Sequence, residues 1–245
     1  MINLKICGIT DPNTALHCAK LEIKYLGLNF VPNSPRQIDI QTAQVINQIL
    51  IQNNLRNQVK IVLLVKNMSN QDITKLIQTK FKKKDQTKDQ TDIFDIIQLH
   101  GTETIEQVLD LKAQMTKISI NLPIWKAIDS GMSFGYIQQI CQLTNDQILD
   151  NILLDSPKNP DYKTGKVFQS QMLYDFVRLE TNKSLNSLPI IAGGINTDNI
   201  QTFLTKYTGS ILDICGGAED KTGRKDLEKI KTLVAKFKTP SPNHS

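Results

Sequence analysis

Two side chains that can move protons stand at the ends of short apolar runs. Cys7 closes the run at residues 4–7, and Asp155 closes the segment NILLD at residues 151–155. A thiol whose pKa is lowered from about 8.5 can take a proton from carbon. Lys5, two residues earlier on the same strand face, would assist it electrostatically if its side chain points inward. A carboxyl at an apolar rim can hold a proton and act as an acid. Residue type alone leaves two alternatives open, a small core residue for Cys7 and a cap for Asp155.

Two glycine pairs follow apolar runs late in the chain. They are Gly193-Gly194 and Gly216-Gly217. Paired glycines let backbone N–H groups approach a phosphate closely, and α/β barrels often bind phosphate in the loops after their last two strands. The alternative is that these glycines only form tight turns.

Three polar residues at or beyond the ends of apolar runs are candidates for binding a substrate. Arg36 follows Ser34-Pro35, and a guanidinium can hold a carboxylate through two parallel hydrogen bonds. Gln98 and Asp213 are candidates by position. An exposed arginine is also commonly just solvated, so this alternative stays open for Arg36. His100, without a partner in the sequence, is interpreted as a structural residue.

The elements that would position these residues alternate in type along the chain. Segments with helical spacing of apolar residues connect short apolar runs that have no clean polar alternation, as in buried parallel strands. We therefore predict α/β architecture and a single-domain (β/α)8 barrel, whose reactive groups lie at the C-terminal ends of its strands. An open sheet with one missed strand is the alternative. The eight predicted strands are residues 4–7, 25–30, 60–65, 96–99, 124–127, 152–154, 189–192 and 211–214.

The barrel is predicted to span residues 1–238, with one polar insertion. Residues 82–92 (KKKDQTKDQTD) contain no apolar side chain, so we expect a solvated, mobile segment; a basic docking patch is the less favoured alternative. Residues 239–245, rich in Pro and Ser, are expected to be a disordered tail.

Bulk properties narrow the class of protein. The 245-residue chain has a net charge of +5, which is compatible with a phosphorylated small substrate and is weak evidence for a nucleic-acid partner. Its four cysteines lack CxxC pairing or zinc-site spacing. No signal peptide and no apolar run of about 20 residues is visible, so we expect a cytoplasmic protein with free thiols that does not associate with membranes.

Six motifs, in order, resemble the phosphoribosylanthranilate isomerase family of tryptophan biosynthesis. The resemblance runs from residue 5 to about residue 226, through KICGIT, GLNFVPNSPR, IIQLHG, NILLDS, IIAGGIN and LDICGGAEDKTGRKD. It implies a (β/α)8 barrel that uses no cofactor or metal. It also implies an Amadori rearrangement of N-(5-phosphoribosyl)anthranilate to 1-(2-carboxyphenylamino)-1-deoxyribulose 5-phosphate. We expect a monomer or a homodimer.

The resemblance also implies roles for individual residues. Cys7 matches the general base and Asp155 the general acid. Arg36 matches the arginine that holds the anthranilate carboxylate, and Asp213 matches a supporting aspartate. The phosphate loops correspond to Gly194, Gly216 and Gly217, with Gly193 beside them.

The chain departs from the family pattern in two loops. Tyr162 and Lys163 stand where the family has a glycine pair after the sixth strand, and Cys215-Gly216 replaces a pair of serines. Two other functions stay open at this point: a flavin-dependent barrel oxidoreductase, and a non-catalytic barrel that binds a sugar phosphate as a sensor or scaffold.

Overall fold

Eight parallel strands pair in the order β1-β10-β9-β8-β7-β6-β3-β2 and close into a barrel, while β4 and β5 form a separate antiparallel pair. This computed structural model describes residues 2–82, 90–129, 131–155, 167–181 and 188–239. The predicted (β/α)8 class is confirmed, and all eight predicted strands are present with bounds that differ by at most two residues. By the distances between Cα atoms the chain divides into two compact units, Ile6–Ile124, and Ile2–Lys5 together with Trp125–Ser245.

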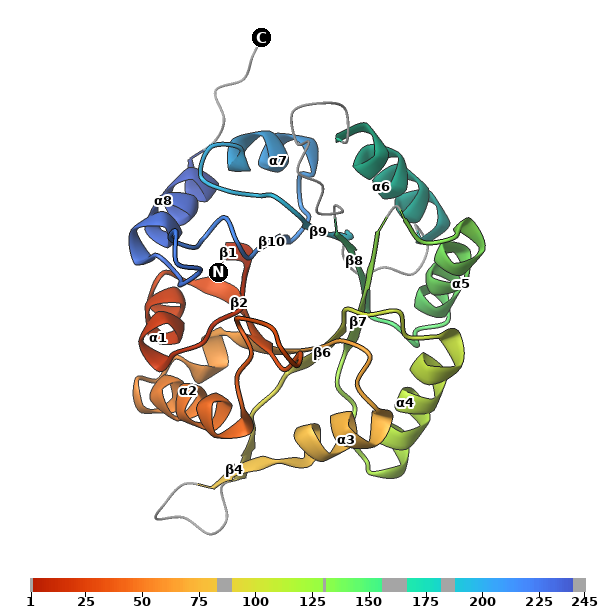
Figure 1. The fold of residues 1–245 in the computed structure, drawn as a ribbon, viewed down its shortest axis with the longest axis horizontal. Helices are drawn as coiled ribbons and strands as arrows, with labels where there is room; N and C mark the ends of the chain where they lie inside the picture. The colour runs from red at the N-terminus through yellow and green to blue at the C-terminus, as the bar shows by residue number, and fades with distance from the viewer. Residues whose placement is uncertain (1, 83–89, 130, 156–166, 182–187, 240–245) are drawn as a thin grey trace. The chain divides into compact units, whose positions relative to one another are not determined.

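The first unit alternates strands and helices in the predicted manner, and Figure 1 shows α1 and α2 side by side in it. Asp11 accepts a hydrogen bond from the Thr14 backbone N at 2.9 Å and caps α1, which begins at Pro12. Strand β3 is buried from Ile61 to Val65, as expected for a parallel strand covered on both faces. Its elements are β1 (Ile2–Cys7, shared with the second unit), α1 (Pro12–Lys20), β2 (Ile23–Asn29), α2 (Ile40–Gln52), a 3-10 turn (Arg56–Gln58), β3 (Lys60–Val65), α3 (Asn70–Gln78), β4 (Lys80–Lys82), β5 (Gln90–Asp92), β6 (Ile96–Leu99) and α4 (Ile105–Lys117).

The polar insertion predicted at residues 82–92 overlaps the end of β4 and all of β5. Lys82 and Gln90–Asp92 belong to this antiparallel ladder, in which Lys80 pairs with Asp92. Residues 83–89 lie outside the described residues, so the mobility of the insertion stays a prediction, as does that of the tail beyond residue 239.

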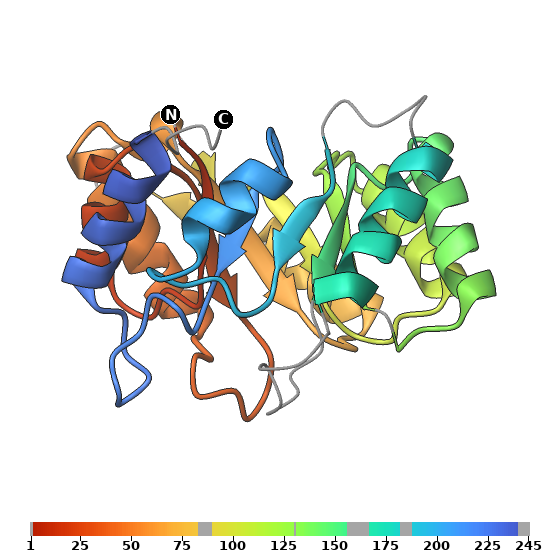
Figure 2. The same ribbon diagram turned by 90° about the horizontal axis from the view of Figure 1, so that it is seen from above.

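The second unit continues the alternation, and Figure 2 shows α5 and α6 side by side in it. Strands β7, β8, β9 and β10 pair in parallel, in sequence order. Its elements are β7 (Ile124–Ile128), α5 (Phe134–Asn145), β8 (Asn151–Asp155), α6 (Val167–Thr181), β9 (Ile190–Ala192), α7 (Ile200–Lys206), β10 (Leu212–Ile214) and α8 (Leu227–Lys238).

Candidate active site

Cys7 ends β1 and is followed by a glycine that supports the side chain of Arg36. Cys7 is only 6% exposed. Gly8 has a φ of +79°, and a Cβ built on it would lie 2.5 Å from Cδ of Arg36. A residue with a side chain at position 8 would therefore be strained and would displace the arginine. The aliphatic part of Arg36 thus packs on the residue directly after the predicted base.

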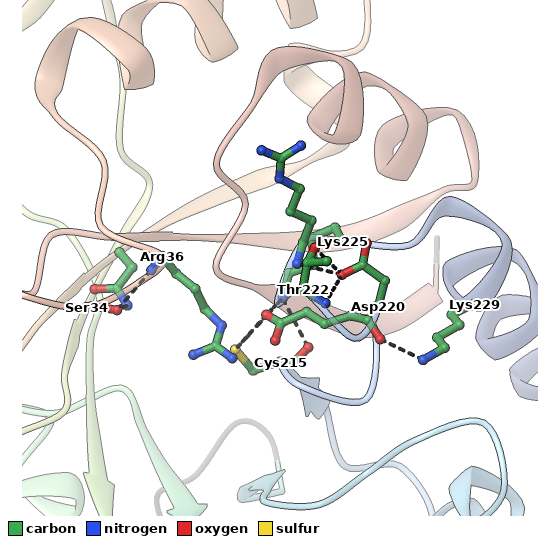
Figure 3. Close-up of polar contacts among 10 residues, drawn as sticks. Ser34, Arg36, Cys215, Asp220, Thr222, Lys225 and Lys229 are labelled. Atoms are coloured by element: carbon green, nitrogen blue, oxygen red, sulfur yellow. Dashed lines mark hydrogen bonds and ion pairs between the residues drawn. The ribbon is translucent and has the colours of Figure 1, made fainter.

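The loop that carries Arg36 is held by hydrogen bonds from the end of β2. Asn29 accepts from the Val31 backbone N at 2.8 Å and donates to Oγ of Ser34 at 3.0 Å. The same Oγ accepts from the Arg36 backbone N at 3.2 Å, as Figure 3 shows. These bonds fix the backbone from which the guanidinium extends.

Gln98 in β6 is fully buried, and its side-chain amide forms a hydrogen bond with the ring of His100. Its Nε2 and Nδ1 of His100 are 2.9 Å apart. Within the described part of the chain, its Oε1 has no hydrogen-bond partner. A buried amide oxygen without a partner is costly, so it is a suitable acceptor for a donor group on a substrate.

Glu103 is a structural residue that the sequence did not single out. Its buried carboxylate accepts from the Asn67 backbone N at 2.9 Å and from the Gly101 backbone N at 3.1 Å. It therefore joins the loops that follow β3 and β6. In the sequence, the only feature that could have drawn attention to Glu103 is the capping box of α4 beside it, formed by Thr104 and Gln107.

Asp213 in β10 forms a buried ion pair with Lys5. Lys5 Nζ and Asp213 Oδ2 are 2.9 Å apart, and their side chains are 0% and 6% exposed. Asp213 Oδ1 is also buried and has no hydrogen-bond partner in the described ranges. The structure therefore gives Lys5 a carboxylate partner that the sequence did not pair with it, and its electrostatic assistance of Cys7 stays a prediction.

Asp155 in β8 and Asp213 in β10 are in the same register on either side of β9. Both residues pair in register with Ala192 of β9. Partners in a parallel ladder project from the same face, and two strand spacings amount to about 10 Å. The carboxyl of Asp155 therefore projects from the sheet face on which Asp213 meets Lys5.

The two predicted phosphate loops contact each other through their backbones. Asn196 and Gly217 form a parallel bridge, and a Cβ on Gly217 would lie 2.8 Å from Cα of Asn196. Gly217 is thus required for packing. Gly193 and Gly194 have φ values of +93° and +66°, which supports the tight-turn alternative for this pair. A Cβ on Gly216, in contrast, would meet only Oε2 of Glu219, at 4.0 Å.

A charged cluster holds the loop after β10. Lys225 Nζ lies 2.6 Å from Oε1 of Glu219, and the two side chains are 2% and 5% exposed. The same Nζ donates to the carbonyl O of Cys215 at 3.0 Å, and Lys229 Nζ donates to the carbonyl O of Glu219 at 2.6 Å. Figure 3 shows the side chains of Lys225 and Lys229 bonded to different parts of this loop.

The tip of this loop is a compact turn. Asp220 accepts from Oγ1 and from the backbone N of Thr222, both at 2.7 Å. These two bonds lower the pKa of the Asp220 carboxyl below its ordinary value.

No group of three or more His, Cys, Asp or Glu side chains that could hold a metal occurs in the described ranges. The departure at Tyr162-Lys163 lies outside the described residues, so its effect on phosphate binding stays open.

Comparison with known families decides the identity. Residues 4–236 match the family described as N-(5'phosphoribosyl)anthranilate (PRA) isomerase. The chain belongs to the phosphoribosylanthranilate isomerase family. The resemblance inferred from the six motifs is therefore confirmed.

Individual relatives in this isomerase family match along almost their whole length. N-(5'-phosphoribosyl)anthranilate isomerase of Clostridium beijerinckii is 29% identical over 99% of this chain and 100% of the relative. The Bacillus cereus protein of the same name is 31% identical over 96% of this chain and 98% of its own length.

Solved structures support the fold. Phosphoribosyl anthranilate isomerase from Thermotoga maritima superposes with a TM-score of 0.69 at 23% identity, covering 97% of this chain and 99% of that one. A second isomerase structure, with a TM-score of 0.66 at 22% identity and the same coverage, contains reduced 1-(o-carboxyphenylamino)-1-deoxyribulose 5-phosphate.

Proposed function

We propose that this chain isomerises N-(5'-phosphoribosyl)anthranilate to 1-(2-carboxyphenylamino)-1-deoxyribulose 5-phosphate in tryptophan biosynthesis. The chain is an isomerase by its family, which matches residues 4–236 and was predicted from the motifs. The main support is this match over nearly the whole chain. Cys7 and Asp155 also lie at the C-terminal ends of β1 and β8, where barrel enzymes carry their reactive groups. The reduced ketose phosphate bound to a solved relative is a derivative of the expected product.

The proposed chemistry needs one acid and one base. Asp155 protonates the ring oxygen of the aminoaldose, the ring C–O bond breaks, and the nitrogen lone pair forms a Schiff base at C1. Cys7 then removes the proton from C2, and the electron pair of that bond neutralises the iminium nitrogen through an enolamine. Protonation at C1 and loss of the hydroxyl proton at C2 give the ketone. No atom is gained or lost overall.

The remaining site residues hold the substrate. Arg36, with its stem on Gly8, pairs with the anthranilate carboxylate. Backbone N–H groups of the loops after β9 and β10 hold the phosphate, through Gly193, Gly194, Gly216 and Gly217. Gln98 Oε1 and Asp213 Oδ1, for which the described residues offer no hydrogen-bond partner, are suited to accept from hydroxyl or amine groups of the substrate.

We further propose a cytoplasmic monomer or homodimer that acts on a phosphorylated small molecule and not on nucleic acid. In the part of the chain that the structure describes, none of the helices has both the length and the apolar character needed to span a bilayer.

A turnover assay tests the proposed function. Phosphoribosylanthranilate is generated in situ, and its fluorescence is followed after the purified protein is added. We expect loss of fluorescence at a rate proportional to enzyme concentration, and growth of a tryptophan auxotroph that lacks this step when it expresses the chain. Soluble, folded protein that does neither would refute the proposal and would favour the non-catalytic barrel. A yellow protein with a flavin absorption band would favour the oxidoreductase.

A further inference from the structure

A buried lysine at the base of the loop after β10 controls one peptide group of that loop. Lys225 Nζ donates to the carbonyl O of Cys215 at 3.0 Å while it pairs with Glu219 at 2.6 Å. The carbonyl O of Cys215 also accepts from the Ala218 backbone N at 3.2 Å. Both lone pairs of this carbonyl are therefore engaged on the protein side of the loop.

This arrangement determines the direction of the next N–H group. The described chain has no cis peptide bond, and in a planar trans peptide the C=O and N–H bonds point in opposite directions. The N–H of Gly216 therefore points away from Lys225 and Ala218. No acceptor for it is found among the described residues.

The absence of a side chain at Gly216 leaves this N–H accessible. Its neighbour Gly217 is required by the close backbone of Asn196, but a Cβ on Gly216 would have no contact closer than 4.0 Å. An ammonium bonded to the carbonyl polarises the peptide, so the N–H becomes a stronger donor towards an anion.

Stability alone does not explain why a charged pair is buried here. Replacing a buried ion pair by apolar side chains of similar volume is often neutral or stabilising, because both charges lose their hydration. The side chains of Lys225 and Glu219 are 2% and 5% exposed, so they carry this cost.

We propose that Lys225 is a positioning residue for the substrate phosphate: it holds the Cys215 carbonyl so that the Gly216 N–H is aimed at the phosphate group. Glu219 orients Lys225, and Lys229 fixes Glu219 through its backbone carbonyl. The proposal rests on the proposed function, since it presumes a phosphorylated substrate at this loop.

The test compares phosphate binding in three variants. Lys225→Met removes the ammonium and, with it, the ion pair to Oε1 of Glu219. Glu219→Met/Lys225→Met removes both charges and guards against simple misfolding. Lys231→Met serves as the matched control. Lys231 forms an ion pair with Glu228 on the exposed face of α8, where the two side chains are 48% and 79% exposed. The dissociation constant of inorganic phosphate is measured by calorimetry, with circular dichroism to verify folding.

We expect phosphate binding to weaken about tenfold in both Lys225 variants and to be unchanged in Lys231→Met. With phosphoribosylanthranilate, KM should rise while kcat is largely kept, and kcat/KM for the dephosphorylated substrate should not change. A merely structural role would lower kcat/KM equally for both substrates. That result, or wild-type phosphate affinity in a folded Lys225 variant, would overturn the proposal.

The calorimetric measurement separates this proposal from the proposed function. If the wild-type protein binds phosphate in a Lys225-dependent manner but does not turn over phosphoribosylanthranilate, the positioning role stands and the proposed reaction is wrong. If turnover is normal and phosphate affinity does not depend on Lys225, the proposed reaction stands and the positioning role is wrong. A wild-type protein that turns over substrate but shows no phosphate binding also overturns the positioning role.

Discussion

Nζ of Lys5 and Oδ2 of Asp213 are joined at 2.9 Å although the two residues are 208 positions apart in sequence. Removing Lys5 takes away the cation that compensates the buried charge of Asp213, whereas removing both charges leaves none to compensate. Lys5→Met should therefore lower the free energy of unfolding by about 3–5 kcal/mol, as measured by urea denaturation. Lys5→Met/Asp213→Asn should recover part of this loss.

An exposed ion pair provides the control for that measurement. Lys75 and Asp72 are 3.1 Å apart on α3, with side chains 72% and 58% exposed. Lys75→Met should change the free energy of unfolding by less than about 1 kcal/mol. If Lys5→Met costs no more than Lys75→Met, the buried pair does not contribute as stated.

Gly8 should be intolerant of a methyl group because Arg36 packs on it. In Gly8→Ala, the left-handed backbone costs about 1–2 kcal/mol, and the new Cβ would displace Cδ of Arg36 from a distance of 2.5 Å. We expect lower stability together with a raised KM for phosphoribosylanthranilate. Gly135→Ala is the control, because a Cβ there meets nothing within 4 Å; it should leave KM unchanged. Equal KM values in the two variants would contradict the role of Arg36 in carboxylate binding.

The acid and the base should each be needed for turnover. Cys7→Ala and Asp155→Asn should each lower kcat by about 10²–10⁴-fold, because proton transfer in the transition state is lost. Steady-state fluorescence assays measure this. Cys141→Ala in α5 and Asp146→Asn at its exposed C-terminal end should remain active. Near-normal kcat in a Cys7 or Asp155 variant would refute the role of that residue.

Cys141 should be inert towards alkylation in the native protein. Burial, and then the charge of Glu180, raises the pKa of its thiol to about 12, from an ordinary value of 9.0. The nucleophilic thiolate is therefore scarce at pH 8.5. Iodoacetamide followed by mass spectrometry should label Cys141 only after unfolding in denaturant. Labelling of the native protein as fast as of the denatured protein would contradict this expectation.

The same shift predicts a loss of stability in alkali. Between pH 9 and pH 12 the unfolded chain gives up the Cys141 proton while the native state retains it. The native state then binds more protons, so the free energy of unfolding falls as the pH rises through this window. Urea denaturation at pH 8.5 and pH 10.5 should show a smaller fall in Cys141→Ala than in the wild-type protein. Equal falls would show that another group is responsible.

Local patterns in the sequence were sufficient for the elements and for the placement of two candidate residues at strand ends. The continuous apolar runs predicted the buried strands because parallel strands are covered on both faces. The Asp11-Pro12 pair predicted the start of α1 because a cap and a first-turn proline act within a few residues. Cys7 and Asp155 were found at strand ends by the same reasoning, and the six motifs identified the family.

Only the tertiary structure decided which side chains meet. Sequence spacing places Lys5 near Cys7 because neighbours on one strand are visible in the sequence, but it gives no sign that the carboxylate partner of Lys5 comes from β10. Neither the packing of Arg36 on Gly8 nor the bond from Lys225 to the Cys215 carbonyl has a local signal, since each depends on how a loop folds back. Periodicity reports which face of an element is buried, whereas a buried charge takes the partner that the closed backbone brings within hydrogen-bond distance.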